Sequence, residues 1–192
     1  MDGKVRLNGA AYMMKWDDIQ LGWFDPDISL LGLVDNIGAA QSKGFEIDSK
    51  MIVSDKLTVT FSYAKNDAKL TEDYNLRGSL AAKKNQDLPF TPDRKYNFGM
   101  TRDLSDSSRI DFNYVYVDQM WNDLFYDNRV MQGAYSIGNL SFTKDLGDQA
   151  SLQIYVDNVF DEIAELFINV EDIQPLTTVN RPCLLYTSPS PR

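Results

Sequence analysis

The chain has 192 residues, with 19 Lys and Arg against 28 Asp and Glu, and a formal net charge of −9. This acidic excess disfavours a nucleic-acid partner, because phosphates are neutralised by Lys and Arg. The mean hydropathy is −0.35, and no apolar stretch approaches the roughly 20 residues of a membrane helix. Histidine is absent and Cys183 is the only cysteine, which argues against a His-based catalytic or metal site, a disulfide and a thiolate metal cluster. No apolar segment follows the first residues, so we expect any signal peptide to lie upstream of this sequence.

Apolar and polar side chains alternate along most of the chain, which predicts β-strands rather than helices. In Leu57–Ala64, for example, every second residue is apolar and large, and the residues between are Thr, Ser or Ala. Several predicted strands reach the 9–11 or so residues that a tilted membrane strand needs. In chain order, strands are predicted near Val5–Phe24, Leu30–Val53, Leu57–Asn66, Lys95–Leu104, Arg109–Asp118, Ala134–Leu146 and Ala150–Asn158.

The connections between these strands alternate between short turns and long polar stretches. Short turns rich in Asp, Ser and Gly lie at residues 54–56, 105–107 and 147–148. Long polar connections cover roughly residues 67–93, 119–132 and a region after Asn158, and an irregular stretch near Asp25–Asp27 joins the first two strands. This order predicts an all-β, antiparallel up-and-down meander, with short turns at one end and long loops at the other.

The long strands and unequal loops favour part of a large transmembrane β-barrel. Only helices and closed barrels pair all their backbone groups in lipid, and outer-membrane barrels combine alternating strands, short periplasmic turns, longer external loops and aromatic girdles. Alternation alone does not separate such a wall from a soluble sandwich. The girdle candidates are Trp16, Trp23, Phe24, Trp121, Phe125 and Tyr126, and the candidate lumen-facing residues are Asp48, Asp111, Asn113 and Asp157.

Four segments, in matching order, resemble motifs of the TonB-dependent outer-membrane receptors. Ala40–Asp48 (AQSKGFEID) resembles a barrel strand of the pattern A-x-x-x-G-x-E-hydrophobic, and Leu88–Gly99 (LPFTPDRKYNFG) is similar to an L-P-x-x-P-x-x-x-x-N-x-G strand start. Ser151–Glu162 (SLQIYVDNVFDE) resembles the penultimate strand, and Val179–Pro182 (VNRP) resembles the start of the final strand. The resemblance covers nearly all of residues 1–182 and implies an incomplete, open part of the barrel, without the plug and the final strand.

The resemblance implies a receptor that takes up a scarce nutrient across the outer membrane of a Gram-negative bacterium. Such receptors bind siderophore-iron, cobalamin or glycan ligands, contact outer-membrane lipid, and are energised by the TonB complex through an N-terminal region that this chain lacks. It implies no enzyme activity and no cofactor. A porin-like outer-membrane barrel and a soluble all-β binding module remain as alternatives at this stage.

The last ten residues, Cys183–Arg192 (CLLYTSPSPR), break the alternation and look like the in-frame translation of a sequencing adapter. We therefore expect two parts. Residues 1–182 form a partial C-terminal TonB-dependent receptor β-barrel of about seven strands, and residues 183–192 form a non-native, artefactual tail. Cys183 is then not a native residue.

No catalytic constellation is present, and no metal site is predicted. Asp17-Asp18 and Asp25-x-Asp27 could supply oxygen ligands to a hard cation, although a solvated acidic loop explains them better. One long loop mixes aromatic and polar groups in a way that suits a sugar or siderophore. The candidate ligand contacts on it are Trp121, Asn122, Asp123 and Tyr126.

Overall fold

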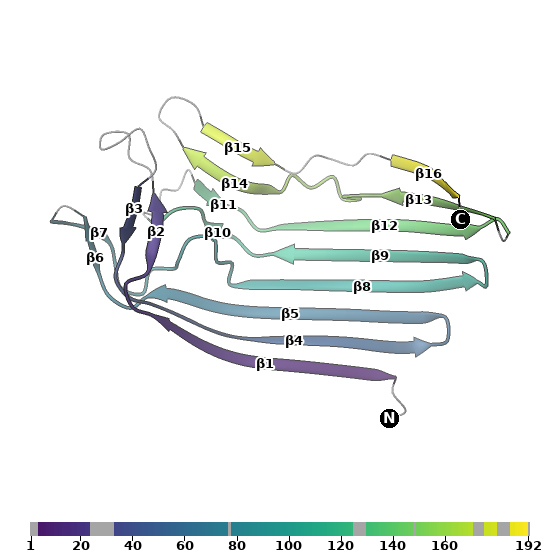
Figure 1. The fold of residues 1–192 in the computed structure, drawn as a ribbon, viewed down its shortest axis with the longest axis horizontal. Helices are drawn as coiled ribbons and strands as arrows, with labels where there is room; N and C mark the ends of the chain where they lie inside the picture. The colour runs from purple at the N-terminus through teal and green to yellow at the C-terminus, as the bar shows by residue number, and fades with distance from the viewer. Residues whose placement is uncertain are drawn as a thin grey trace.

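In a computed structural model, most of the chain forms one antiparallel sheet of eight strands (Figure 1). The strand order in this sheet is β1-β4-β5-β8-β9-β12-β13-β16. The structure describes residues 4–23, 33–76, 78–124, 130–147, 149–170, 175–179 and 185–191. Each neighbour in the sheet is the next of these strands along the chain, so the predicted all-β up-and-down meander is confirmed. The strands are β1 (Val5–Trp16), β4 (Ala40–Ser54), β5 (Leu57–Leu70), β8 (Arg94–Ser105), β9 (Ser108–Val117), β12 (Tyr135–Asp145), β13 (Ala150–Val156) and β16 (Leu185–Pro191).

The two ends of the sheet differ as the loop lengths predict. At one end, β4 joins β5 and β8 joins β9 through the two-residue turns Asp55-Lys56 and Asp106-Ser107. At the other end, on the left of Figure 1, the chain forms short hairpins between the long strands. Among the described residues, no helix is long and apolar enough to cross a membrane. The hairpins are β2 (Gln20–Trp23) with β3 (Leu33–Asn36), β6 (Tyr74–Leu76) with β7 (Ser79–Ala82), β10 (Met120–Trp121) with β11 (Met131–Gln132), and β14 (Glu165–Val170) with β15 (Pro175–Val179).

The prediction that Val5–Phe24 and Leu30–Val53 are each one strand is wrong. The first breaks after Trp16, where Asp18 takes a φ of 56°, and the second breaks before Ala40, where Gly38 takes a φ of 92°. The two breaks are paired, because the Ile19 amide donates to the Gly38 carbonyl at 2.8 Å. The long sheet thus ends at the same row for β1 and β4, and the chain continues there into hairpin β2–β3. Phe24 and the residues up to 32 lie outside the described part of the chain.

The buried core lies at the loop end and not along the sheet. Ile37 and Leu70 are each only 1% exposed, and they pack with small and aromatic residues from the hairpins and strand ends. Along the middle of the long strands, by contrast, large apolar side chains such as Leu7 and Phe61 are exposed. A soluble sandwich buries one face of its sheet, so this exposed sheet does not fit that alternative. The core cluster comprises Ile37, Ala40, Ala68, Leu70, Tyr74, Ala82, Leu88 and Leu124.

We expected no further strand beside β13. In the structure β16 lies there and pairs with β13 from Val156↔Leu185 to Ala150↔Pro191. Strand pairing runs through backbone groups, so any extended segment can add to an open sheet edge whatever the origin of its sequence. The assignment of residues 183–192 as a non-native tail, and the boundary at Pro182, therefore stay predictions.

Candidate functional site

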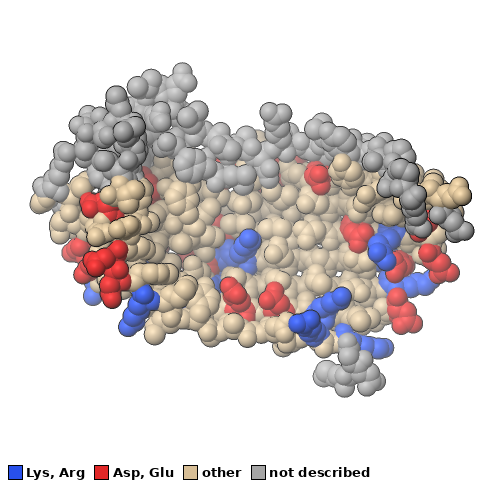
Figure 2. Space-filling model, viewed as in Figure 1, with Lys and Arg blue, Asp and Glu red and all other residues tan. Residues whose placement is uncertain are grey.

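One face of the sheet is polar, and the cross-strand register aligns its residues in rows. Asp48 lies between Asn8 and Ser62, and Asp111 lies between Thr101 and Ser141. Because side chains alternate along a strand and paired residues share a face, these rows belong to a single surface. In the view of Figure 2, acidic side chains gather at the loop end of the molecule, on the left, and again, beside basic ones, at the opposite end on the right.

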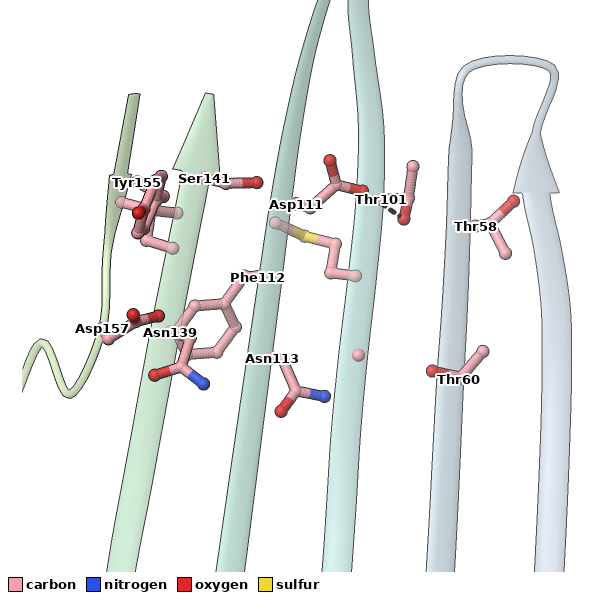
Figure 3. A pocket seen from close by; sticks show the side chains of 13 residues that line it. Thr58, Thr60, Thr101, Asp111, Phe112, Asn113, Asn139, Ser141, Tyr155 and Asp157 are labelled. Atoms are coloured by element: carbon pink, nitrogen blue, oxygen red, sulfur yellow. Dashed lines mark hydrogen bonds between the residues drawn. The ribbon is translucent and has the colours of Figure 1, made fainter. Parts of the chain in front are cut away.

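A shallow hollow of about 340 Å³ lies on this polar face, across five strands from β5 to β13 (Figure 3). The Thr101 hydroxyl donates to the Asp111 carboxylate at 2.7 Å, which is the dashed line in Figure 3. Hydroxyl, amide and carboxylate groups make this surface suited to water and polar solutes. The predicted lumen-facing residues Asp111, Asn113 and Asp157 all line the hollow.

The opposite face is apolar and exposed. Leu7 is 68% exposed and Met13 63%, and residues of the same alternation on β4, β5 and β12 include other large apolar side chains. On β8 the apolar segment lies between Arg102 and Arg94, which at about 3.3 Å per residue is a length of about 26 Å along the strand. Strands of outer-membrane barrels are tilted by about 35–45°, so this length covers about 20 Å of membrane thickness, which is somewhat less than the apolar band of about 25 Å on such barrels.

Tyrosines cross the apolar face at the loop end. Tyr63 pairs with Tyr96, which pairs with Tyr116, and the rings of Tyr96 and Tyr116 stack with centroids 4.7 Å apart. The ring of Phe45 lies 5.7 Å from that of Tyr63 and continues the band onto β4. We call these four residues the aromatic band. Amphipathic rings in this arrangement are typical of the membrane–water interface.

The aromatic band replaces the predicted girdle where the structure describes it. Trp16 follows Tyr12 by four residues on β1, so it lies on the polar face, where the Tyr12 hydroxyl bonds Asn66. Trp121 lies in hairpin β10–β11, beyond the end of β9. The girdle prediction is therefore wrong for both tryptophans. The side chains of Trp23, Phe24, Phe125 and Tyr126 lie outside the described part of the chain.

Charged side chains lie directly beyond the tyrosines of the aromatic band on the same face, in the row where Phe45 pairs with Lys65. Lys65 pairs across the strands with Arg94, and the Arg94 Nε donates to Asp118 at 2.7 Å. Burial of Asp118 opposes its ionisation, but the hydrogen bonds from Arg94 and the Gln119 amide outweigh burial and hold its pKa below the usual value. Further along β5, Asp67 accepts from Lys69 at 2.8 Å and lies 3.3 Å from Lys43.

The structure places three of the four predicted ligand contacts on strand β10 and directly after it, before β11. Trp121 is half-buried, and its carbonyl accepts from the Phe90 amide at 2.8 Å. Asn122 is 7% exposed, its Nδ2 donates to the Val130 carbonyl at 3.2 Å, and its Oδ1 accepts from the Ile168 amide. Asp123 is half-buried. Tyr126 lies outside the described residues, and the assignment of all four as ligand contacts stays a prediction.

Two sets of residues were not found from the sequence. The aromatic band and the Lys65–Arg94 pair come from strands far apart in the chain, and only the register brings them into adjacent rows. The signal for the band was a tyrosine near the loop end of three strands, at Tyr63, Tyr96 and Tyr116. Asp17 and Asp18 are exposed at the break after β1, while Asp25 and Asp27 lie outside the described residues. The described part of the chain holds no group of three or more acidic, His or Cys residues able to bind a metal.

The sequence profile of the family described as TonB dependent receptor-like, beta-barrel matches residues 1–159. The chain belongs to this TonB-dependent receptor β-barrel family. Members of the family are transport receptors rather than enzymes, and the family resides in the Gram-negative outer membrane. No protein in the curated set matches the sequence.

Solved structures of TonB-dependent receptors share the fold of this family member at low sequence identity. The ferric yersiniabactin uptake receptor FyuA from Yersinia pestis superposes with a TM-score of 0.76 and 18% identity, over 96% of this chain and 27% of that protein. The ferric-catecholate import receptor Fiu from Escherichia coli K12, in its closed form, gives 0.75 and 16%, over 100% and 26%. The copper transporter OprC gives 0.72 and 15%, over 96% and 27%. The chain thus spans about a quarter of the length of these structures.

Proposed function

We propose that this chain forms part of the barrel wall of an outer-membrane receptor that takes up a scarce nutrient with energy from the TonB complex. The observation that carries the proposal is the two-faced sheet of this family's barrel, with an exposed apolar face, an aromatic band and a polar face opposite. In this arrangement the apolar face contacts lipid and the polar face lines the lumen. The protein is then located in the outer membrane of a Gram-negative bacterium.

The substrate class that we propose is siderophore-iron, cobalamin or glycan. Ferric siderophore chelates come first, because the relatives FyuA and Fiu are named for ferric yersiniabactin and ferric-catecholate uptake. The lumenal hollow offers Thr, Asn and Ser groups that exchange hydrogen bonds with water or a passing polar ligand without titrating. TonB would act through a plug region encoded elsewhere in the gene.

We also propose that the loop bearing Trp121, Asn122, Asp123 and Tyr126 contacts the substrate outside the membrane. Hairpin β10–β11 lies at the loop end, and long loops of outer-membrane barrels are external. Asn122 holds the hairpin to Val130 and Ile168, which fixes the position of the neighbouring Trp121 and Asp123. A flat aromatic ring beside polar groups suits both sugar rings and catecholate rings.

Uptake by cells tests both proposals. The full-length gene that contains this sequence is expressed in a Gram-negative strain deleted for its own receptors, and cells are supplied with labelled ferric siderophores, cobalamin or oligosaccharides. We expect accumulation of one class that disappears in a TonB deletion. Trp121→Ala should raise the half-saturating substrate concentration about ten-fold, as expected for loss of a stacked aromatic contact, while Asn75→Ala in hairpin β6–β7 should not. Uptake that persists without TonB contradicts the receptor function and supports a passive porin.

A further inference from the structure

We propose that Asn113, Asn139 and Asp157 form a contact site for a sugar ring on the lumen wall, and that the transported substrate is a glycan. All three residues line the hollow of about 340 Å³ on the polar face (Figure 3). Ligand sites of proteins have volumes of about 300–1,000 Å³, so this hollow suits a small unit of a larger ligand, such as a ring of an oligosaccharide. The inference rests on the proposed function, in which the polar face lines the path of the substrate.

The three side chains form a row across neighbouring strands. Asn113 of β9 pairs directly with Asn139 of β12. Asp157 follows directly after β13, whose last residue, Val156, pairs with Leu140. Asp157 therefore lies beside Asn139, as Figure 3 shows. Neighbouring strands are about 4.8 Å apart, so the row is about 10 Å long and a ligand that lies across it reaches all three groups.

A turn after β13 fixes the orientation of the central residue. The Asn158 amide donates to Asn139 Oδ1 at 2.8 Å, so Asn139 Nδ2 keeps its N–H groups for another acceptor. Asn158 is itself only 5% exposed. Its Nδ2 donates to the Glu162 carbonyl at 2.9 Å, and its Oδ1 accepts from the Glu162 amide at 3.1 Å. A buried turn thus holds the donor of the row in place before a ligand arrives.

The groups of the row match the hydrogen-bonding pattern of sugar hydroxyls. Asn139 offers donors, the ionised Asp157 carboxylate only accepts, and the Asn113 amide does both. Asn113 and Asp157 are exposed, and neither side chain has a bonding partner in the described part of the chain. A hydroxyl both donates and accepts, so neighbouring hydroxyls of a sugar would accept from Asn139 and donate to Asp157 at the same time.

The charge of the hollow separates a glycan from an anionic iron chelate. Among the described residues that line the hollow, Asp111 and Asp157 carry carboxylates and none is Lys or Arg. An anionic ferric chelate would meet like charges and no cation, which is unfavourable. A neutral sugar meets no such repulsion. The names of the relatives FyuA and Fiu favour ferric chelates, whereas the residues of this wall favour a glycan.

The test is uptake by cells that express the full-length gene, supplied in separate arms with labelled oligosaccharides of glucose, mannose and xylose, with a labelled ferric catecholate and with labelled cobalamin. We expect TonB-dependent accumulation of an oligosaccharide. Asn113→Leu keeps the side-chain size and removes the donor and the acceptor, so it should lower the maximal uptake rate per receptor about five-fold. Asp157→Lys should lower this rate at least as much. Asn8→Leu is the matched control, because Asn8 lies on the polar face of β1 outside the hollow, and its rate should be unchanged.

The amount of each variant in the outer membrane is measured alongside, so that a loss of folding is not counted as a loss of transport. Absence of oligosaccharide uptake overturns this inference, and TonB-dependent uptake of another class in the same cells leaves the receptor function standing. Uptake that persists without TonB contradicts the receptor function instead. Equal rates in Asn113→Leu and the unaltered receptor, or an equal loss in Asn8→Leu, also overturn the proposed site.

Discussion

At the scale of single residues, Gly44 shows how a strand motif works. A Cβ at this position would lie 2.8 Å from the Tyr12 Cζ and against the Lys65 carbonyl oxygen. Tyr12 is the cross-strand partner of Gly44, and its ring lies over the glycine while its hydroxyl donates to Asn66 Oδ1 at 3.2 Å. Ser42 donates to the same oxygen at 2.6 Å. Glycine is therefore required here for the close approach of a ring and a backbone, and not for a turn.

Replacing Gly44 by alanine should destabilise the barrel by about 1–3 kcal/mol, because the added methyl group collides with a backbone atom that cannot move alone. The measurement is the thermal unfolding midpoint of the full-length receptor in detergent. Gly9→Ala on the neighbouring strand is the control, since its added Cβ meets only the Glu46 carbonyl at 3.5 Å. Equal midpoints for the two variants would contradict the proposed role of Gly44.

At the scale of elements, the long strands were predictable and their outer ends were not. β5 was predicted to stop at Asn66 but continues to Leu70. Its outward residues change from apolar to charged at Lys65, because the strand leaves the lipid there while its pairing with β4 goes on. The alternation of apolar and polar residues indicates which surroundings each face of a strand meets. It does not indicate where the backbone hydrogen bonds between neighbouring strands end. The short hairpins were missed for a related reason, since their cores form from residues of several loops.

One side-chain contact joins two of these hairpins. The Tyr74 hydroxyl of β6 donates to Asp35 Oδ2 of β3 at 2.7 Å, and Tyr74 is only 6% exposed. Burial, and then the Asp35 carboxylate, raise the pKa of Tyr74 to about 12. The protonated phenol is the donor, so its contribution to stability is fully present below about pH 10, the ordinary tyrosine pKa. That contribution is lost as the pH rises through 12.

Subtracting the alkaline absorbance titration of Tyr74→Phe from that of the unaltered receptor should therefore isolate one phenol with a midpoint near pH 12. Asp35→Asn keeps the burial and removes the charge, so the midpoint of Tyr74 should move down towards its ordinary value. A difference titration centred near pH 10, with or without Asp35, would show that the two hairpins are not joined in this way.

At the scale of the whole molecule, the two faces became visible only with the register. A slip of one residue would move every side chain of a strand to the other face, so no single strand sequence shows which tyrosines form a band. The register places Asp48, Asp111 and Asn113 on one polar face, and this shared face was predictable because polar residues interrupt apolar alternation within one strand. The aromatic band could not be predicted from the sequence, because its members come from four different strands, β4, β5, β8 and β9. The proposed orientation, with the apolar face towards lipid and the polar face towards the lumen, rests on the family's barrel architecture.

The sheet formed by this chain alone is open, with β1 and β16 at its two edges. An edge strand presents unpaired N–H and C=O groups that pair readily with another chain, and β1 adds exposed apolar residues such as Leu7 and Met13. We expect the isolated 192-residue chain to aggregate in buffer and to form oligomers in detergent whose size rises with concentration, by size-exclusion chromatography with light scattering. The full-length receptor, in which the wall is closed by the remaining strands, should stay monomeric under the same detergent conditions. A folded monomer of the isolated chain in detergent-free buffer would contradict the lipid-facing assignment of its apolar face.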